Sequence, residues 1–191
     1  METKTVLLSG VGGQGIILAS DVLSMVAMEE GLDVKKSEVH GMSQRGGEVV
    51  STVRFGEKVY SPIVGPGMAD FLFSLEKLEA LRNVDYLKPD GIAVVSDYRF
   101  DPLPVAAGLA DYPEGVIEKI KEMVNNAHIV HALDLALEAG TIRTMNIVML
   151  GALSKFLPFK KDTWFRVIEK RVPPKFVDIN KRAFELGLNA V

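Results

Sequence analysis

The chain has 191 residues, of which 48% are hydrophobic and 25% charged, a composition typical of one globular domain with a well-buried core. The net charge is −3 and aromatic residues make up only 7%, so nucleic acid is not expected as a partner, and no apolar run is long enough to cross a bilayer. The sequence contains no cysteine, which excludes disulfides, a cysteine nucleophile and a cysteine-ligated iron–sulfur cluster within this chain.

The first predicted unit is a buried strand at residues 3–9 that runs into Gly10-Val11-Gly12-Gly13-Gln14-Gly15. This stretch has the G-x-G-x-x-G spacing of a dinucleotide-binding loop, and apolar residues then recur at helical spacing over residues 16–28. The free N–H groups at a helix start attract an anion. A nucleotide or coenzyme phosphate could therefore be held by Gly12, Gly13, Gln14 and Gly15. Alternatively, the glycines only let the helix pack closely on the sheet.

A second predicted strand at residues 33–38 is followed by a loop, residues 39–48, that is rich in glycine. An arginine and an amide beside flexible backbone form a donor-rich surface suited to phosphate or carboxylate, although the loop could also be a plain polar crossover. Both glycine loops follow a predicted strand, so we expect them to meet at the carboxyl edge of the sheet. The candidate site residues in this second loop are His40, Ser43, Gln44, Arg45, Gly46 and Gly47.

Alternation of apolar and polar residues predicts a strand at residues 48–55, and residues 58–60 are expected to return beside it as a hairpin. Residues 88–91 predict a turn, and residues 98–115, which contain three prolines, predict a long irregular connection. The remaining predicted strands lie at 69–74, 92–96 and 128–130, and the remaining predicted helices at 75–82, 116–124, 133–139, 144–156, 164–170 and 175–186.

Three polar residues of the later chain, His128, His131 and Asn146, are possible site residues. His128 and His131 lie three apart, but no carboxylate pattern completes a metal site, which favours structural histidines. Asn146 lies inside a strongly apolar predicted helix, where it either makes buried hydrogen bonds or contributes to the site.

Residues 155–191 are basic whereas the rest of the chain is acidic, which is typical of solvated helix faces and less often of a docking patch.

Several blocks of the sequence taken together resemble the gamma component of 2-oxoacid:ferredoxin oxidoreductases, including the beta subunit of indolepyruvate ferredoxin oxidoreductase. These blocks are GVGGQG after a strand, SEVHGMSQRGGEVVSTVRFG, ADFLF, LKPDG and TIRTMNIVMLGAL. The resemblance implies one α/β domain over residues 1–191, Rossmann-like, with a mostly parallel sheet, a β-hairpin and a helical C-terminal part. It also implies that the domain binds no NAD despite its glycines.

The resemblance further implies a non-catalytic subunit of a complex from anaerobic metabolism, and the N-terminus, which does not resemble a signal peptide, predicts a cytoplasmic location. That complex converts a 2-oxoacid, such as indolepyruvate, another aryl pyruvate or pyruvate, with coenzyme A and oxidised ferredoxin into acyl-CoA, carbon dioxide and reduced ferredoxin. Thiamine diphosphate, Mg²⁺ and [4Fe-4S] clusters are expected in partner subunits, so this chain would form a hetero-oligomer, or a homodimer when isolated. No catalytic or metal-binding residue is assigned to this chain. Its candidate residues would contact coenzyme A or the partner.

The alternative function is a stand-alone NAD(P)-dependent oxidoreductase. The glycine loop supports it, but a dinucleotide-binding domain also needs an acidic residue at the end of its second strand to bind the ribose. Asp33 and Glu38 are the two candidates, and neither stands at a convincing position.

Overall fold

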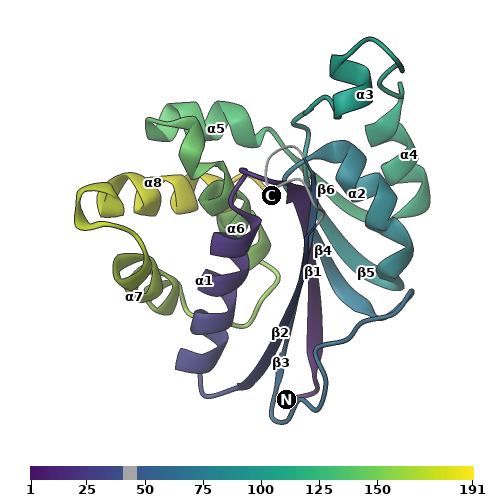
Figure 1. The fold of residues 1–191 in the computed structure, drawn as a ribbon. Helices are drawn as coiled ribbons and strands as arrows, with labels where there is room; N and C mark the ends of the chain where they lie inside the picture. Colours follow the sequence, from purple (N-terminus) through teal and green to yellow (C-terminus); the bar gives the residue numbers. More distant parts are fainter. Residues whose placement is uncertain (41–46) are drawn as a thin grey trace.

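A six-stranded sheet with the order β2-β3-β1-β4-β5-β6 forms the centre of the molecule (Figure 1). The computed structural model describes residues 1–40 and 47–191. The β1–β4, β4–β5 and β5–β6 pairs are parallel, whereas β3 is antiparallel to both of its neighbours. The predicted α/β class with a mostly parallel sheet is therefore confirmed. The strands are β1 (Lys4–Val11), β2 (Asp33–His40), β3 (Glu48–Gly56), β4 (Ala69–Ser74), β5 (Leu87–Ser96) and β6 (Asn126–Val130).

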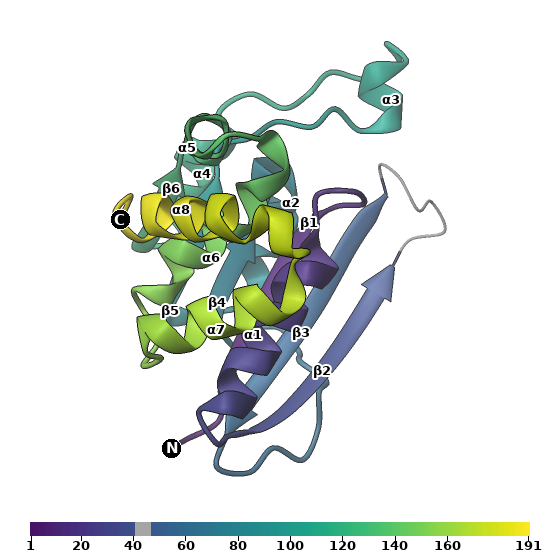
Figure 2. The same ribbon diagram turned by 90° about the vertical axis from the view of Figure 1, so that its left-hand side faces the viewer.

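Helices cover both faces of the sheet (Figures 1 and 2). One face packs against α1 and α6, on which α5, α7 and α8 pack in turn, and the other face packs against α2 and α4. Short 3₁₀ turns at residues 84–86, 142–144 and 174–176 connect some of these elements. The helices are α1 (Ile16–Glu29), α2 (Lys77–Asn83), α3 (Leu103–Ala106), α4 (Val116–Met123), α5 (Ala132–Ala139), α6 (Met145–Ser154), α7 (Lys161–Arg171) and α8 (Val177–Leu188).

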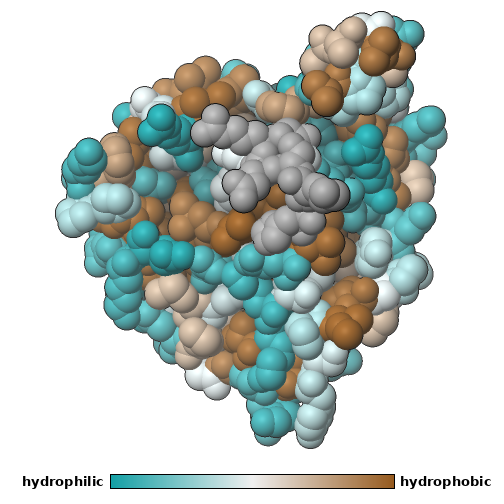
Figure 3. Space-filling view, viewed as in Figure 1, coloured by the Kyte–Doolittle hydropathy of each residue, from teal (hydrophilic) through white to brown (hydrophobic). Residues whose placement is uncertain are grey.

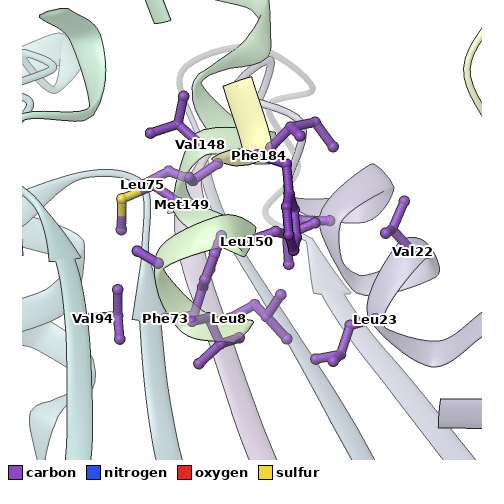
Figure 4. Packing of buried hydrophobic residues seen from close by; sticks show 14 of the residues in the cluster. Leu8, Val22, Leu23, Phe73, Leu75, Val94, Val148, Met149, Leu150 and Phe184 are labelled. Atoms are coloured by element: carbon purple, nitrogen blue, oxygen red, sulfur yellow. The ribbon is translucent and has the colours of Figure 1, made fainter. Parts of the chain in front are cut away.

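The larger core lies between the sheet and α6, which is buried along its whole length. Figure 4 shows Leu8 and Phe73 of the central strands pointing toward Leu150 of α6, with Leu23 of α1 and Phe184 of α8 closing the cluster. Burying a large apolar side chain of this kind stabilises the fold by about 1.5–3 kcal/mol. The buried helix predicted at residues 144–156 is therefore confirmed as α6, and its apolar composition is explained by burial on every side.

The hairpin predicted around residues 56–57 is wrong, because its second strand does not form. Both edges of β3 are already paired, one with β1 and the other with β2, so residues 58–60 have no edge to join. They are held instead by side chains: the Val59 N–H donates to Asp33 Oδ2 at 2.9 Å. The hairpin that the structure does contain is β2–β3.

Two further predictions differ from the structure. Residues 88–91, predicted as a turn, belong to β5, because a register shift opposite Ala69 and Phe71 lets the strand accommodate Pro89 and Gly91. Residues 98–115, predicted as irregular, contain the one-turn helix α3 and form an arm that projects from the molecule (Figure 2).

The basic C-terminal helices pair with acidic side chains of the body. Glu29 of α1 accepts from Lys170 at 2.6 Å and from Arg166 at 3.4 Å, and Asp21 pairs with Arg171. These pairs agree with the interpretation of the basic region as solvated helix faces. No helix in the described ranges combines the length and the apolar character needed to span a bilayer.

Candidate functional site

A cleft of about 510 Å³ opens at the carboxyl edge of the sheet. The chain turns from β1 into α1 on one face and from β4 into α2 on the other, which makes this edge a topological switch point. Ligands of open α/β sheets bind at such points. The cleft is lined by the first glycine loop, the chain after β5 and the start of α6, namely Gly12, Gly13, Gln14, Gly15, Leu18, Tyr98, Phe100, Ile142, Arg143, Met145 and Asn146.

Gln14 folds back to hold the first glycine loop in shape. Its Oε1 accepts from the Val11 N–H at 2.7 Å, and its Nε2 donates to the Leu75 carbonyl at 3.3 Å. A side chain at Gly10 would lie 2.9 Å from this Oε1, which explains the first glycine of the motif. Gln14 therefore acts mainly as a brace between the loop and the end of β4.

The two glycine loops meet where they are described: the Gly12 N–H donates to the Gly47 carbonyl at 2.8 Å. They meet because β1 and β2 run in the same direction, so both end at the same edge of the sheet. His40 is the last residue of β2 and pairs with Val49. The other candidates of the second loop, Ser43, Gln44, Arg45 and Gly46, lie outside the described residues.

Gly13 and Gly15 carry the loop donors that can bind a ligand. Both have positive φ values, +103° and +87°, which glycine adopts without strain. Within residues 1–40 and 47–191, no hydrogen-bond partner is recorded for either backbone N–H. Together with the first turn of α1, they present N–H groups and a partial positive charge to the cleft. An anion is the ligand that this arrangement favours.

Asn146 connects the start of α6 to the glycine loop. Its Nδ2 donates to the Gly15 carbonyl at 3.2 Å, and its Oδ1 accepts from the Ile147 N–H at 2.9 Å. The side chain is buried and also lines the cleft. The two interpretations of Asn146 are therefore compatible, since it makes buried hydrogen bonds while forming a wall of the site.

The sequence interpretation missed the opposite wall of the cleft. Tyr98 and Phe100 come directly after β5, and Arg143 lies in the 3₁₀ turn before α6. Arg143 is exposed, and no partner of its guanidinium is recorded in the described part of the chain. A polar or aromatic residue directly after a parallel strand is the signal that points to Tyr98 and Phe100, whereas no local pattern identifies Arg143.

The topology disagrees with a dinucleotide site. In a dinucleotide-binding domain the second strand is parallel to the first and lies beside it. Here antiparallel β3 lies between β1 and β2, so the end of β2 is one strand further from the cleft. Glu38 pairs with Lys36 at 2.5 Å, and Asp33 lies at the opposite end of β2, where Lys35 and the Val59 N–H lower its pKa to about 2.

The histidines occupy separate positions. The ring of His128 lies 4.6 Å from that of Phe156, and His131 Nδ1 lies 2.6 Å from Asp97 Oδ2 at the carboxyl ends of β5 and β6. The described residues contain no group of three or more His, Asp or Glu side chains placed to hold a metal ion. Neither histidine lines the cleft.

Glu79 of α2 carries a buried carboxylate near the start of β3. The residue is 3% exposed, its Oε1 accepts from Arg82 at 2.7 Å, and its Oε2 has no hydrogen-bond partner in the described structure. Burial raises the pKa of Glu79 to about 7; Arg82 acts in the opposite direction, whereas Glu48 and Glu76 raise the pKa further.

Replacing Glu79 with glutamine is expected to remove a pH-dependent part of the stability. The folded state binds this proton more tightly than the unfolded state, whose ordinary pKa is 4.5, so the stabilisation is complete below pH 4.5 and is lost as the pH rises through 7. The shift corresponds to roughly 3 kcal/mol. Urea unfolding between pH 5 and 8 should show this decline in the wild type but not in Glu79→Gln, and the exposed control Glu118→Gln should behave as the wild type. Parallel pH profiles for all three proteins would contradict the assignment.

Comparison with known proteins identifies relatives over the whole chain. Residues 5–190 match the family model described as pyruvate ferredoxin/flavodoxin oxidoreductase. The chain is 42% identical to the indolepyruvate oxidoreductase subunit IorB of Thermococcus kodakarensis, across 100% of this chain and 96% of the relative. It is 41% identical, with the same coverage, to the subunit of the same name from Pyrococcus horikoshii.

Among solved structures, the fold is similar to that of the keto/oxoacid ferredoxin oxidoreductase gamma subunit of Geobacter sulfurreducens. The two chains are 25% identical with a TM-score of 0.71, and the match covers 98% of this chain and 97% of the other. None of these three relatives is named as an NAD(P)-dependent enzyme, so the stand-alone dehydrogenase has no support. The chain belongs to the pyruvate ferredoxin/flavodoxin oxidoreductase family.

Proposed function

We propose that this protein is the non-catalytic, gamma-type subunit of a cytoplasmic 2-oxoacid:ferredoxin oxidoreductase. The complex would oxidatively decarboxylate a 2-oxoacid, of which indolepyruvate or another aryl pyruvate is the leading class, to acyl-CoA, carbon dioxide and reduced ferredoxin. The observation that carries the proposal is the 42% identity, across essentially both full lengths, to a chain named as a subunit of indolepyruvate oxidoreductase. Residues 1–191 would act as one domain of this complex.

The reactive cofactors are assigned to a companion subunit. The chain has no cysteine to ligate a [4Fe-4S] cluster, and the described residues contain no group of three or more His, Asp or Glu side chains placed to hold a metal ion. The clusters are therefore assigned to the companion because this chain has no cysteine, and thiamine diphosphate with Mg²⁺ is assigned to the companion because of the family to which the chain belongs. Ferredoxin would reach the complex through the companion.

The cleft is proposed as a contact site for coenzyme A. The N–H groups of Gly13 and Gly15, which have no partner among the described residues, and the guanidinium of Arg143 suit a phosphate. Tyr98 and Phe100 provide an apolar wall for the uncharged part of the ligand. The role of His40 and of Ser43 to Gly47 in binding coenzyme A or a partner carboxylate remains a prediction from the sequence.

Replacing Arg143 with alanine in the reconstituted complex is expected to raise KM for coenzyme A about tenfold, because a charge-assisted contact contributes about 1.5–3 kcal/mol. The KM for the 2-oxoacid should stay unchanged, because the substrate pocket is assigned to the companion. Steady-state kinetics with each substrate varied in turn provides the measurement.

Arg182→Ala is the matched control, because Arg182 is an exposed arginine of α8 whose recorded pair, Glu138, is 4.0 Å away. An unchanged KM for coenzyme A in Arg143→Ala, or an equal rise in Arg182→Ala, would show that the cleft is wrongly assigned.

Calorimetric titration of the isolated chain with NADH should give no binding heat, and micromolar binding would revive the dehydrogenase alternative.

A further inference from the structure

The most prominent feature outside the cleft is the projecting arm, residues 97–112. It leaves the carboxyl end of β5, carries α3 at its tip and returns toward α4. Figure 2 shows its two legs side by side, with α3 held well away from the sheet and the other helices. In the space-filling view the tip stands out at the upper right with apolar side chains on its surface (Figure 3).

The tip is apolar and exposed. Leu103 and Leu109 are 81% and 82% exposed, and residues 102–110 contain no charged side chain. Leaving two leucines in water forgoes the stabilisation that burying them would provide. Contiguous exposed apolar surface on a folded protein marks an interaction site more often than isolated exposed residues do.

The base of the arm is fixed by one buried carboxylate. Glu76 Oε1 accepts from the Phe100 N–H of the outgoing leg at 3.2 Å and from the Tyr112 hydroxyl of the returning leg at 2.6 Å. The guanidinium of Arg99 lies 4.3 Å from the centre of the Tyr112 ring, and the Lys77 N–H donates to the Tyr98 carbonyl at 3.1 Å. The direction of the arm is therefore set by the body of the protein.

The tip is also folded without help from another molecule. The Leu109 N–H donates to the Pro104 carbonyl at 2.8 Å, and the Ala107 N–H donates to the Leu103 carbonyl at 2.9 Å. Gly108, with φ of +71°, ends the turn of α3. A preformed tip on a fixed base loses little conformational entropy on binding, which is the property of a docking element.

We propose that the arm inserts its uncharged tip into an apolar groove of the companion subunit and so seats that subunit over the cleft. This inference rests on the proposed function. Its support is continuity: Tyr98 and Phe100 form both the base of the arm and a wall of the cleft, so a chain bound to the arm lies at the mouth of the site. The neighbouring pocket of about 360 Å³ has four charged side chains, Lys77, Arg99, Glu114 and Glu118, among its nine lining residues, which disfavours it as a seat for the uncharged tip of a second copy.

The test is the double variant Leu103→Asp/Leu109→Asp, co-expressed with the companion chain. The wild-type complex is identified by its thiamine diphosphate and iron content and by its mass in light scattering. We expect the variant to bind the companion at least about a hundredfold more weakly, because two apolar contacts are lost and two charges would have to be buried. The melting temperature of the isolated variant should equal that of the wild type, since both leucines are exposed.

The matched control is Tyr60→Asp/Ile63→Asp, which changes two apolar side chains that are 89% and 75% exposed on the segment after β3. This control should assemble as the wild type does. Wild-type affinity in the arm variant, or equal weakening in the control, overturns the inference. An isolated wild-type dimer that the arm variant converts to a monomer also overturns it, because the occupant is then a second copy. If the wild-type chain itself binds no cofactor-containing companion, the proposed function fails as well.

Discussion

Substituting Gly187 with alanine is expected to destabilise the fold more than any other single methyl group added to this chain. Gly187 lies where α8 crosses α6, and a Cβ there would stand 1.7 Å from the Val148 carbonyl oxygen. The same contact involves Gly151 of α6, whose Cβ would stand 2.1 Å from the Phe184 carbonyl oxygen. Both clashes are with backbone atoms, so no side chain can rotate away and the two helices have to separate.

The sign of the Gly187→Ala effect separates packing from helix propensity. In a helix interior alanine is favoured over glycine by about 1 kcal/mol, and Gly187 lies one residue before the end of α8, so propensity alone predicts a stabilisation of at most this size. Overpacking costs typically 1–3 kcal/mol and more when backbone has to move, so we expect a net loss of about 3 kcal/mol or no folded protein. Urea unfolding, or soluble yield if the variant does not fold, provides the measurement.

Glu185→Ala on the same helix serves as the control, because it removes only an exposed pair with Lys161. Its stability should stay within about 1 kcal/mol of the wild type. A Gly187→Ala variant as stable as the wild type would mean that α6 and α8 do not pack as closely as described.

The second large effect is expected at the cleft, from Gly15→Ala. Gly15 has φ of +87°, and a Cβ there would stand 2.5 Å from Asn146 Nδ2. The new methyl group would displace the Asn146 side chain and distort the start of α1, where the N–H groups assigned to the ligand lie. In the reconstituted complex we expect KM for coenzyme A to rise at least about tenfold, since a lost hydrogen bond to a charged group costs about 1.5–3 kcal/mol.

A double-mutant cycle shows whether the collision with Asn146 causes this effect. Asn146→Ala removes the side chain that the new methyl group meets, so Gly15→Ala should cost less in that background than in the wild type. Neither Gly15 nor Asn146 belongs to the arm, so both variants should still assemble with the companion. Purifying each variant as an intact complex checks this before KM is measured. Strictly additive effects on KM would show that backbone strain at Gly15, and not the contact with Asn146, is responsible.

Several features of the molecule could be predicted because their causes are local. The apolar run of residues 3–9, the glycine turn and the helical spacing from Ile16 are neighbours in the chain, and each has the structure that its own residues favour. The burial of α6 follows in the same way from its unbroken apolar composition. The contact between Gly12 and Gly47 joins distant segments, but a general rule predicts it, because loops that follow strands running in the same direction lie at the same edge of the sheet.

The rest depended on contacts between distant segments. Residues 58–60 alternate as a strand does, yet they form none because β3 has no free edge. Antiparallel β3 lies beside β1, and this pairing argues against a dinucleotide site. The residues of β2 and β3 do not by themselves indicate which of the two strands pairs with β1. Edge pairing is set by the whole sheet and the helices that cover it, so no window of sequence encodes it.

The candidate site shows the same division. The sequence by itself determined the glycine donors at the start of α1 and the absence of cysteine, because backbone freedom and side-chain chemistry belong to single residues. Only the tertiary structure placed Tyr98, Phe100 and Arg143 opposite Gly15, and only it turned residues 97–112 into an arm fixed by Glu76. The physical reason is that a cleft is formed by side chains from separate elements, whose approach is decided by packing of the core.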